Sequence, residues 1–465
     1  MIDLGLFLFV MGLLALGLRR PFLWVLAYLY IDILQPQEIG WRFSAALPLS
    51  LIAFCAAFAG WLLADSKRGA RFGLRQGLLL VLLAYVTLTT SWAAFPEFAA
   101  LKFGWVWKAL VFAIFLPLTL TTRLRIEAVT LLMVLTAGAI VIDGGIKTAT
   151  GGGGYGVLYL FVNDNNGMYE SSTIATVSIA IIPMILWLAR HGTIFPPDWR
   201  VRMFAGALIF SCLLIPVGTE ARTGLLCIGV LGLLMLRNVK RRAAYVLGAA
   251  SLVLVALPFL PQSYFQRMDT IEEHDEDKSA STRVAVWQWT MDYAREHPMG
   301  GGFDAYRGNT FTYKMPVVTS TGNTTAVQYE KVTDQARAYH SAIFEMLGEQ
   351  GYPGLALWLW IHALGLWQME RIRRRWKNRT APGETWQAPL ASALQFAQAI
   401  YLVGSLFQGI AYQPFVLMLV GLQCGVWTYC KRTDSLKDKP RRGRVPAAGR
   451  AKAGGAVTAG ARALR

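Results

Sequence analysis

The stretch LIPVGTEARTGLLCIGVL, residues 214–231, places a short polar turn between two apolar runs. A helix of roughly 20 apolar residues is long enough to cross the hydrocarbon core of a bilayer. The apolar runs on either side of the turn extend over residues 203–218 and 223–236. We interpret the stretch as the end of one transmembrane helix, a turn outside the membrane and the start of the next helix.

The same alternation continues along almost the whole chain. Of its 465 residues, 55% are hydrophobic and only 16% are charged, which is too apolar for one soluble domain of this length. We therefore expect an all-α polytopic integral membrane protein with about twelve to thirteen transmembrane helices. The predicted spans lie near 3–18, 21–36, 46–64, 76–92, 103–121, 126–146, 168–190, 203–218, 223–236, 244–261, 352–369, 388–409 and 413–430.

The formal net charge of +17 is concentrated in particular loops. Basic clusters follow alternate spans, at 18–21, 65–75, 121–125, 237–243, 370–379 and from 431 onward. Because Lys and Arg are enriched in cytoplasmic loops, these loops are predicted to be cytoplasmic. The loops 35–43, 91–102, 150–167 and 262–340 are then predicted to lie outside. With thirteen spans the N-terminus also lies outside, and with one span fewer it lies inside. The expected partners of this charge are membrane lipids, with no nucleic acid.

The chain divides into four predicted parts. Residues 1–261 and 352–430 hold the N-terminal and C-terminal transmembrane helices. Residues 262–351 form a large outer loop that contains short helices. Residues 431–465 have almost no large apolar side chain, so we expect a disordered basic tail in the cytoplasm.

The outer loop is the one part long enough to form a subdomain. A helix is predicted from a cap at Ser281 or Thr282 to the break at Pro298, lying on the membrane surface through its tryptophans. The Thr-rich stretch 309–334 is expected to be irregular. A short helix then leads into the next span, with His340 at its head.

His340 is the histidine best placed for chemistry. Of the five histidines, His191 falls in a cytoplasmic loop, His362 in a span, His274 among acidic residues and His297 at the end of the surface helix. Only His340 combines an outer position with a helix start, and an unperturbed pKa near 6.5 suits a general base. The alternative is a histidine whose ring is held by a backbone carbonyl.

Two outer arginines are candidates for binding a diphosphate. Arg222 lies where one span ends outside and the next begins, and Arg283 lies at the predicted start of the surface helix. A guanidinium offers phosphate oxygens a planar fork of donors. The alternative for Arg222 is an ion pair with Glu220. Lys102 and Arg337 are the next candidates for the same anion.

A polar run at 163–166, with the sequence NDNN, offers Asn163 and Asp164 as polar groups that could line an outer cleft; the alternative is a simple turn. One Asp among three Asn makes a poor divalent-cation site. All five cysteines lie within or at the end of apolar spans. We therefore expect neither a metal nor another cofactor.

Several of these segments together resemble a known family. TEARTG at 219–224, STRVAVWQWTMDYAREHPMGGGFDAY at 281–306 and AYHSAIFEMLGEQGYPG at 338–354 resemble the O-antigen ligase and O-antigen polymerase superfamily. The N-terminal half is similar to the O-glycosylation ligases within it, through LRRPFLWVLAYLYIDILQPQEIGWRFSAALP at 18–48 and GGGGYGVLYLFVNDNNGMYESSTIATVSIAIIPM at 151–184. Each motif is short, and their order and spacing carry the resemblance.

The resemblance implies a GT-C-type membrane glycosyltransferase in a bacterial inner membrane. Such a ligase transfers a finished glycan from undecaprenyl pyrophosphate to an acceptor, usually the lipid A core of lipopolysaccharide. The transfer takes place on the periplasmic face without a metal or nucleotide. The family's essential histidine corresponds to His340, and its essential arginines correspond to Arg222 and Arg283.

Other functions remain open at this point. An O-antigen polymerase and a protein O-oligosaccharyltransferase use the same lipid-linked donor with different acceptors. A transporter would place charged residues near the middle of the membrane. The candidate residues here gather at the outer surface, which favours an enzyme.

Overall fold

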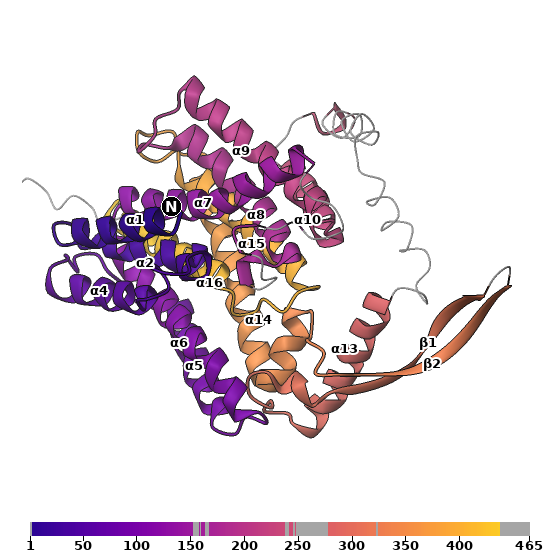
Figure 1. The fold of residues 1–465 in the computed structure, drawn as a ribbon. Coiled ribbons are helices and arrows are strands. Elements are labelled where there is room, and N and C mark those ends of the chain that lie inside the picture. The colour runs from indigo at the N-terminus through magenta and orange to yellow at the C-terminus, as the bar shows by residue number, and fades with distance from the viewer. Residues whose placement is uncertain are drawn as a thin grey trace, which may run out of the picture.

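The computed structural model describes residues 2–151, 158, 160–162, 167–237, 241–244, 247, 278–321 and 324–437 (Figure 1). A helix occupies every predicted span except 244–261, which lies almost entirely outside the described residues. The N-terminal helices are α1 Ile2–Gly17, α2 Phe22–Leu34, α3 Pro36–Ile39, α4 Leu49–Leu63, α5 Leu74–Thr90, α6 Pro96–Thr119, α7 Arg123–Ala149, α8 Ser171–His191, α9 Trp199–Gly218 and α10 Arg222–Leu236. The C-terminal helices are α14 Ala342–Trp376, α15 Gln387–Ser405 and α16 Pro414–Lys437.

The described helices fit a helical membrane protein. Four of them, α6, α7, α8 and α9, are long and apolar enough to cross a membrane. Five more, α1, α2, α4, α5 and α10, are apolar but shorter. The total of twelve to thirteen crossings stays a prediction.

The helices share a buried apolar interior made of two clusters. One cluster joins α2, α7, α8 and α15, with Tyr28, Met133 and Ile179 fully buried. The other joins α5, α6, α14 and α16 around Phe303 and Tyr412. Large apolar side chains outside these clusters stay exposed on the helix surfaces, as expected of faces that meet lipid.

The two predicted sets of loops gather at opposite ends of the helices. At one end, Arg125 donates two hydrogen bonds of 2.7 Å to Asp65, and Arg379 donates one of 2.7 Å to Asp434. We call this the basic end. At the other end, Lys102 bonds Glu345, and we call this the site end. The alternation of basic clusters along the chain therefore predicted which loops share an end.

The chain begins at the site end. The carboxylate of Asp3 accepts hydrogen bonds from the backbone N–H groups of Arg42, Phe43 and Ser44. Arg42 and Phe43 belong to the outer loop 35–43 and Ser44 follows it directly, so these bonds hold the start of α1 beside that loop.

The outer loop contains strands as well as helices. The stretch expected to be irregular forms two antiparallel strands, β1 Thr310–Thr321 and β2 Thr324–Gln335. Both strands are rich in Thr and Val, whose branched side chains favour extended backbone, and only two residues separate them. The all-α prediction is wrong here. The hairpin extends away from the helices (Figure 1).

The helix of the outer loop, α13, covers Lys278–Glu296. It begins before Ser281 and Thr282, so the predicted cap is wrong. No Gly or Pro between Lys278 and Arg283 interrupts the helix, and it therefore runs through both residues. Arg283 consequently lies inside the helix and not at its N-terminal end. A short 3-10 turn, η3 Ala305–Gly308, follows and leads into β1.

The boundary predicted at 431 also needs correction. Helix α16 continues to Lys437, and Arg432 within it donates to the backbone oxygen of Gly69 at 2.7 Å. The positions up to 437 therefore belong to the helical body. The remainder of the predicted tail lies outside the described residues.

Candidate active site

The site end is built around a break in α14. Gly351 has φ 64° and ψ −168°, a backbone conformation that only glycine adopts readily. The glycine run 300–302 lies directly against this break. The N–H of Gly301 donates to the oxygen of Gly348 at 3.0 Å, and the N–H of Gly302 donates to that of Glu349 at 2.9 Å. The two glycine-rich motifs thus clasp each other through their backbones.

A buried cluster of charges lies beside the clasp. The ammonium of Lys102 on α6 is 2.7 Å from a carboxylate oxygen of Glu345 and 2.7 Å from one of Glu349, both on α14. Asp304, just before η3, is 3.7 Å away. Glu345 also accepts from the N–H of Ala411 at 2.9 Å. Lys102 therefore holds three chain segments together, and its own charge is already matched by carboxylates.

The segment that carries His340 is fixed at both ends. Upstream, the side chain of Asn309 donates to the oxygen of Arg337 at 2.7 Å and accepts from its N–H at 2.9 Å. Directly before His340, the oxygen of Tyr339 accepts from the indole of Trp287 at 2.9 Å. The Trp287 ring also stacks on Phe344 at 5.0 Å. The structure therefore packs this tryptophan on α14, and the predicted contact with the membrane surface does not describe it.

His340 lies between Tyr339 and Phe344, the two residues that contact Trp287, and two residues before α14. Its φ of 47° belongs to the left-handed region, which costs a residue with a Cβ roughly 1 to 3 kcal/mol. Its ring reaches solvent and makes no hydrogen bond within the described part of the chain. The alternative of a ring held by a backbone carbonyl therefore finds no support. Crowding by protein atoms lowers the pKa of His340, and the charges of Arg283 and Arg337 lower it further.

The charge of Arg283 acts both on His340 and on Glu170, the residue before α8. Burial raises the pKa of Glu170, the residue before α8, and a hydrogen bond from Thr173 lowers it. The charge of Arg283 lowers it further, whereas the charge of Glu345 raises it. Glu170 is thus near enough to both Arg283 and Glu345 for their charges to act on it.

The helix turn that carries Arg222 packs against α8. It is the first residue of α10, and Glu220 just before it has a φ of 49°. At Gly224, an added Cβ would come within 3.1 Å of the side chain of Ala175 on α8. The first turn of α10 therefore packs against the first turns of α8, close to Glu170.

The other predicted site residues have different outcomes. Arg337 is exposed and lies 2.6 Å from Asp334. Lys102 belongs to the buried cluster, so its assignment to the diphosphate does not follow from the structure. Asn163 and Asp164 lie outside the described residues. No group of three or more His, Cys, Asp or Glu able to hold a metal ion occurs among the described residues.

Sequence reasoning missed the four acidic residues of the site end, Glu170, Asp304, Glu345 and Glu349. A signal was available for two of them. Glu345 and Glu349 are four residues apart, on one face of a predicted helix next to His340. Their partner Lys102 is more than 240 positions away, and no local pattern indicates that contact.

Two known protein families match parts of this chain. Residues 205–359 match the family described as O-Antigen ligase. This match supports membership of the O-antigen ligase superfamily. Residues 1–193 match a family of unknown function (DUF5935). No curated protein matches the chain.

The O-antigen ligase domain contains Arg222, Arg283 and His340, and it implies a membrane glycosyltransferase. Lys102 and Glu170 belong to the N-terminal family region. The ion pair between Lys102 and Glu349 therefore joins the two matched regions at the site end. The buried charge cluster at the site end therefore contains residues from both matched regions.

Proposed function

We propose that this protein is an O-antigen ligase. In this proposal it transfers a glycan from undecaprenyl pyrophosphate to a hydroxyl of the lipid A core oligosaccharide. The observation that carries the proposal is the placement of His340, exposed and beside Arg283, inside an O-antigen ligase domain. The site end would face the periplasm and the basic end the cytoplasm of a bacterial inner membrane.

The reaction needs two things from the protein. The acceptor hydroxyl must lose its proton, and the negative charge of the departing diphosphate must be stabilised. Because the donor sugar already carries a good leaving group, no nucleotide is required. This division of labour assigns one role to a base and the other to cations.

His340 would act as the base. A lowered pKa keeps the imidazole neutral near pH 7, so a ring nitrogen is ready to accept the hydroxyl proton. As that proton leaves, the acceptor oxygen forms a bond to the anomeric carbon. The bond from that carbon to the diphosphate oxygen breaks, and its electron pair leaves with the diphosphate. Attack opposite the leaving group inverts the anomeric centre.

Arg222 and Arg283 would hold the diphosphate. The two residues lie at the start of α10 and within α13. Paired guanidinium donors suit phosphate oxygens and supply charge as it develops on the leaving group. With this charge supplied by arginine, the proposed reaction is independent of a metal ion.

The cluster around Lys102 would have a positioning role. It fixes the first turn of α14, which follows His340 directly. Glu345, the fourth residue of α14, is bonded to both Lys102 and Ala411. Lys102 therefore acts on the reaction through the position of His340 and not through contact with the donor.

The acceptor separates this proposal from its alternatives, an O-antigen polymerase and a protein O-oligosaccharyltransferase. Purified protein is incubated with a lipid-linked glycan in the presence of EDTA. Lipid A core, a second lipid-linked glycan and a pilin-like peptide are offered in separate reactions. The proposal expects transfer to lipid A core alone. Transfer to another acceptor alone would overturn the ligase assignment, and a need for added Mg²⁺ would overturn its metal independence.

A further inference from the structure

The basic end contains a pocket of about 960 Å³ between α8, α10, α14 and α15. It lies at the opposite end of the helices from His340, so the proposed reaction does not use it. Its volume falls within the range of about 300 to 1,000 Å³ that is usual for small-molecule sites. Its lining differs in character from one end to the other.

Cations gather at the end of the pocket nearest the loops. Arg190, Arg241 and Lys377 line it and make no ion pair within the described part of the chain. Arg373 and Arg379 also line it, but each is 2.7 Å from a carboxylate, of Glu370 and Asp434 respectively. Among the described residues, no acidic side chain lines the pocket. Its walls therefore present uncompensated positive charge.

The other end of the pocket is apolar and reaches into the membrane-spanning part of the helices. On α8 the lining passes from Pro183 and Leu186 to Arg190, a rise of about 10 Å at the usual 1.5 Å per residue. Phe396 on α15 and Met235 on α10 complete the apolar wall. A ligand that fits both ends must carry an anionic head and an apolar body.

We propose that this pocket binds an anionic phospholipid, with its phosphate between Arg190, Arg241 and Lys377 and its acyl chains along Pro183 and Phe396. Basic pockets between transmembrane helices at the cytoplasmic side are suited to phospholipid headgroups. Free phosphate would satisfy the cations but would leave the apolar wall uncovered. The change from a basic lining at one end of the pocket to an apolar lining at the other therefore favours a lipid over a soluble anion.

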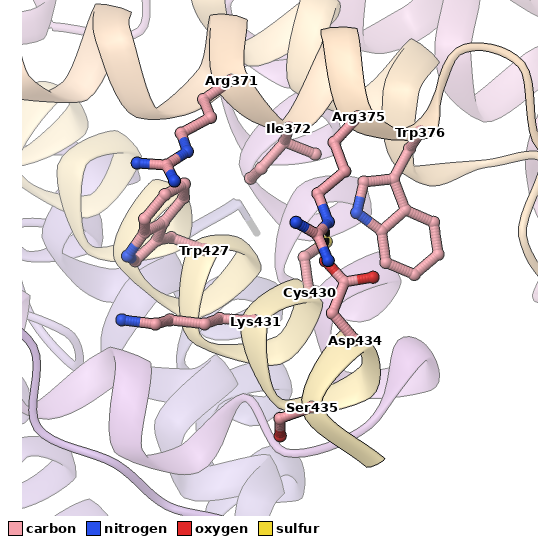
Figure 2. A pocket seen from close by; sticks show the side chains of 9 residues that line it. All are labelled: Arg371, Ile372, Arg375, Trp376, Trp427, Cys430, Lys431, Asp434 and Ser435. Carbon is pink, nitrogen blue, oxygen red and sulfur yellow. Dashed lines mark ion pairs between the residues drawn. The ribbon is translucent and has the colours of Figure 1, made fainter. Parts of the chain in front are cut away.

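A neighbouring hollow provides a matched control. Arg371, Arg375, Trp427 and Lys431 surround it, and it shares Trp376 with the larger pocket (Figure 2). Arg375 is 2.6 Å from Asp434, which also lines this hollow and partly neutralises it. Its volume is smaller, about 270 Å³. Removing two cations here changes the net charge of the basic end as much as removing two from the proposed site.

The test measures lipid binding by native mass spectrometry on the full-length chain, purified in a neutral detergent. The probe is dioleoyl phosphatidylglycerol, with dioleoyl phosphatidylcholine and inorganic phosphate as separate comparisons. The double variant Arg190→Gln/Lys377→Gln is compared with the control Arg371→Gln/Lys431→Gln. A third variant, Arg190→Lys/Lys377→Arg, keeps the charge of the site.

The proposal expects the first variant to bind phosphatidylglycerol at least about tenfold more weakly for each lost charge-assisted contact. The control and the charge-keeping variant should bind it as the unaltered protein does. Phosphatidylcholine should bind weakly, and phosphate should not displace the lipid. Equal weakening in the site variant and the control would overturn the proposal. So would equal binding of phosphatidylcholine, or displacement by phosphate alone.

Discussion

The ammonium of Lys102 lies 2.7 Å from a carboxylate oxygen of Glu349, whose side chain is completely buried. The pair connects α6, in the N-terminal half of the chain, to the first segment of α14, in the O-antigen ligase domain. It also lies next to the glycine clasp, because the backbone oxygen of Glu349 accepts from the N–H of Gly302. In the proposed mechanism, the stability of the site end and its chemistry depend on the same few contacts.

Replacing Lys102 by Met should destabilise the protein. The substitution leaves buried carboxylates without their cation, which typically costs about 3 to 5 kcal/mol when a buried pair is broken. Thermal unfolding in detergent measures the loss. The double variant Lys102→Met/Glu349→Gln should recover part of it, because one of the unpaired charges is gone. If Lys102→Met instead keeps full stability and only raises the KM for the lipid-linked donor, Lys102 binds the diphosphate after all.

Gly351→Ala should also lower stability, by roughly 1 to 3 kcal/mol from backbone strain alone. The added Cβ would in addition lie 2.2 Å from the backbone oxygen of Pro298. Gly104→Ala on α6 is the control, since a Cβ there meets nothing within 4 Å. In a helix interior this control should be neutral or stabilising by up to about 1 kcal/mol. An unchanged unfolding temperature for Gly351→Ala would show that the clasp does not require glycine.

Lysine should not replace arginine at the proposed diphosphate site. Arg222→Lys and Arg283→Lys keep the charge but lose the planar fork of donors. A lost charge-assisted contact is worth roughly 1.5 to 3 kcal/mol, or about ten- to more than a hundredfold in rate. Transfer assays and donor binding on the same preparations measure this effect. A fully active Arg222→Lys, or an Arg222→Ala that simply unfolds, would favour the structural pairing with Glu220.

The pH dependence of transfer should report His340. The neutral ring is the active form, so kcat/KM should fall as the pH drops through the pKa of His340. Since crowding, Arg283 and Arg337 all lower that pKa, the midpoint of the acid limb should lie below the ordinary value of 6.5. Arg337→Gln removes one positive charge and should move the midpoint to higher pH. A midpoint that stays in place in this variant would mean that another group titrates.

Much of the helical architecture was predictable from local pattern. Apolar runs gave the positions of the helices, and the alternation of basic clusters gave the loops that share an end. The exposed His340 at a helix start was also predictable, because its position depends only on the neighbouring sequence. These features follow from hydrophobicity and charge over a few turns of chain.

Long-range contacts were not predictable in this way. The clasp between Gly301 and Gly348 and the pairing of Lys102 with Glu349 join segments that are distant in sequence. The hairpin was missed because its Thr-rich strands look polar, although the Gly-Asn pair at 322–323 between two such runs is a recognised hairpin signal. Arg283 was predicted at the start of its helix, but α13 begins at Lys278, before the cap residues that the sequence suggests.

The most direct test of the account compares two histidines at the site end. His297, at the end of α13, stacks on Tyr293 and is exposed, so it serves as the control. The rate of glycan transfer from the lipid-linked donor is measured for His340→Ala and His297→Ala, with membrane level and thermal stability checked for both. Loss of a general base should slow His340→Ala by about 100- to 10,000-fold, while His297→Ala stays close to the unaltered protein. A folded His340→Ala with near-normal transfer would contradict the account.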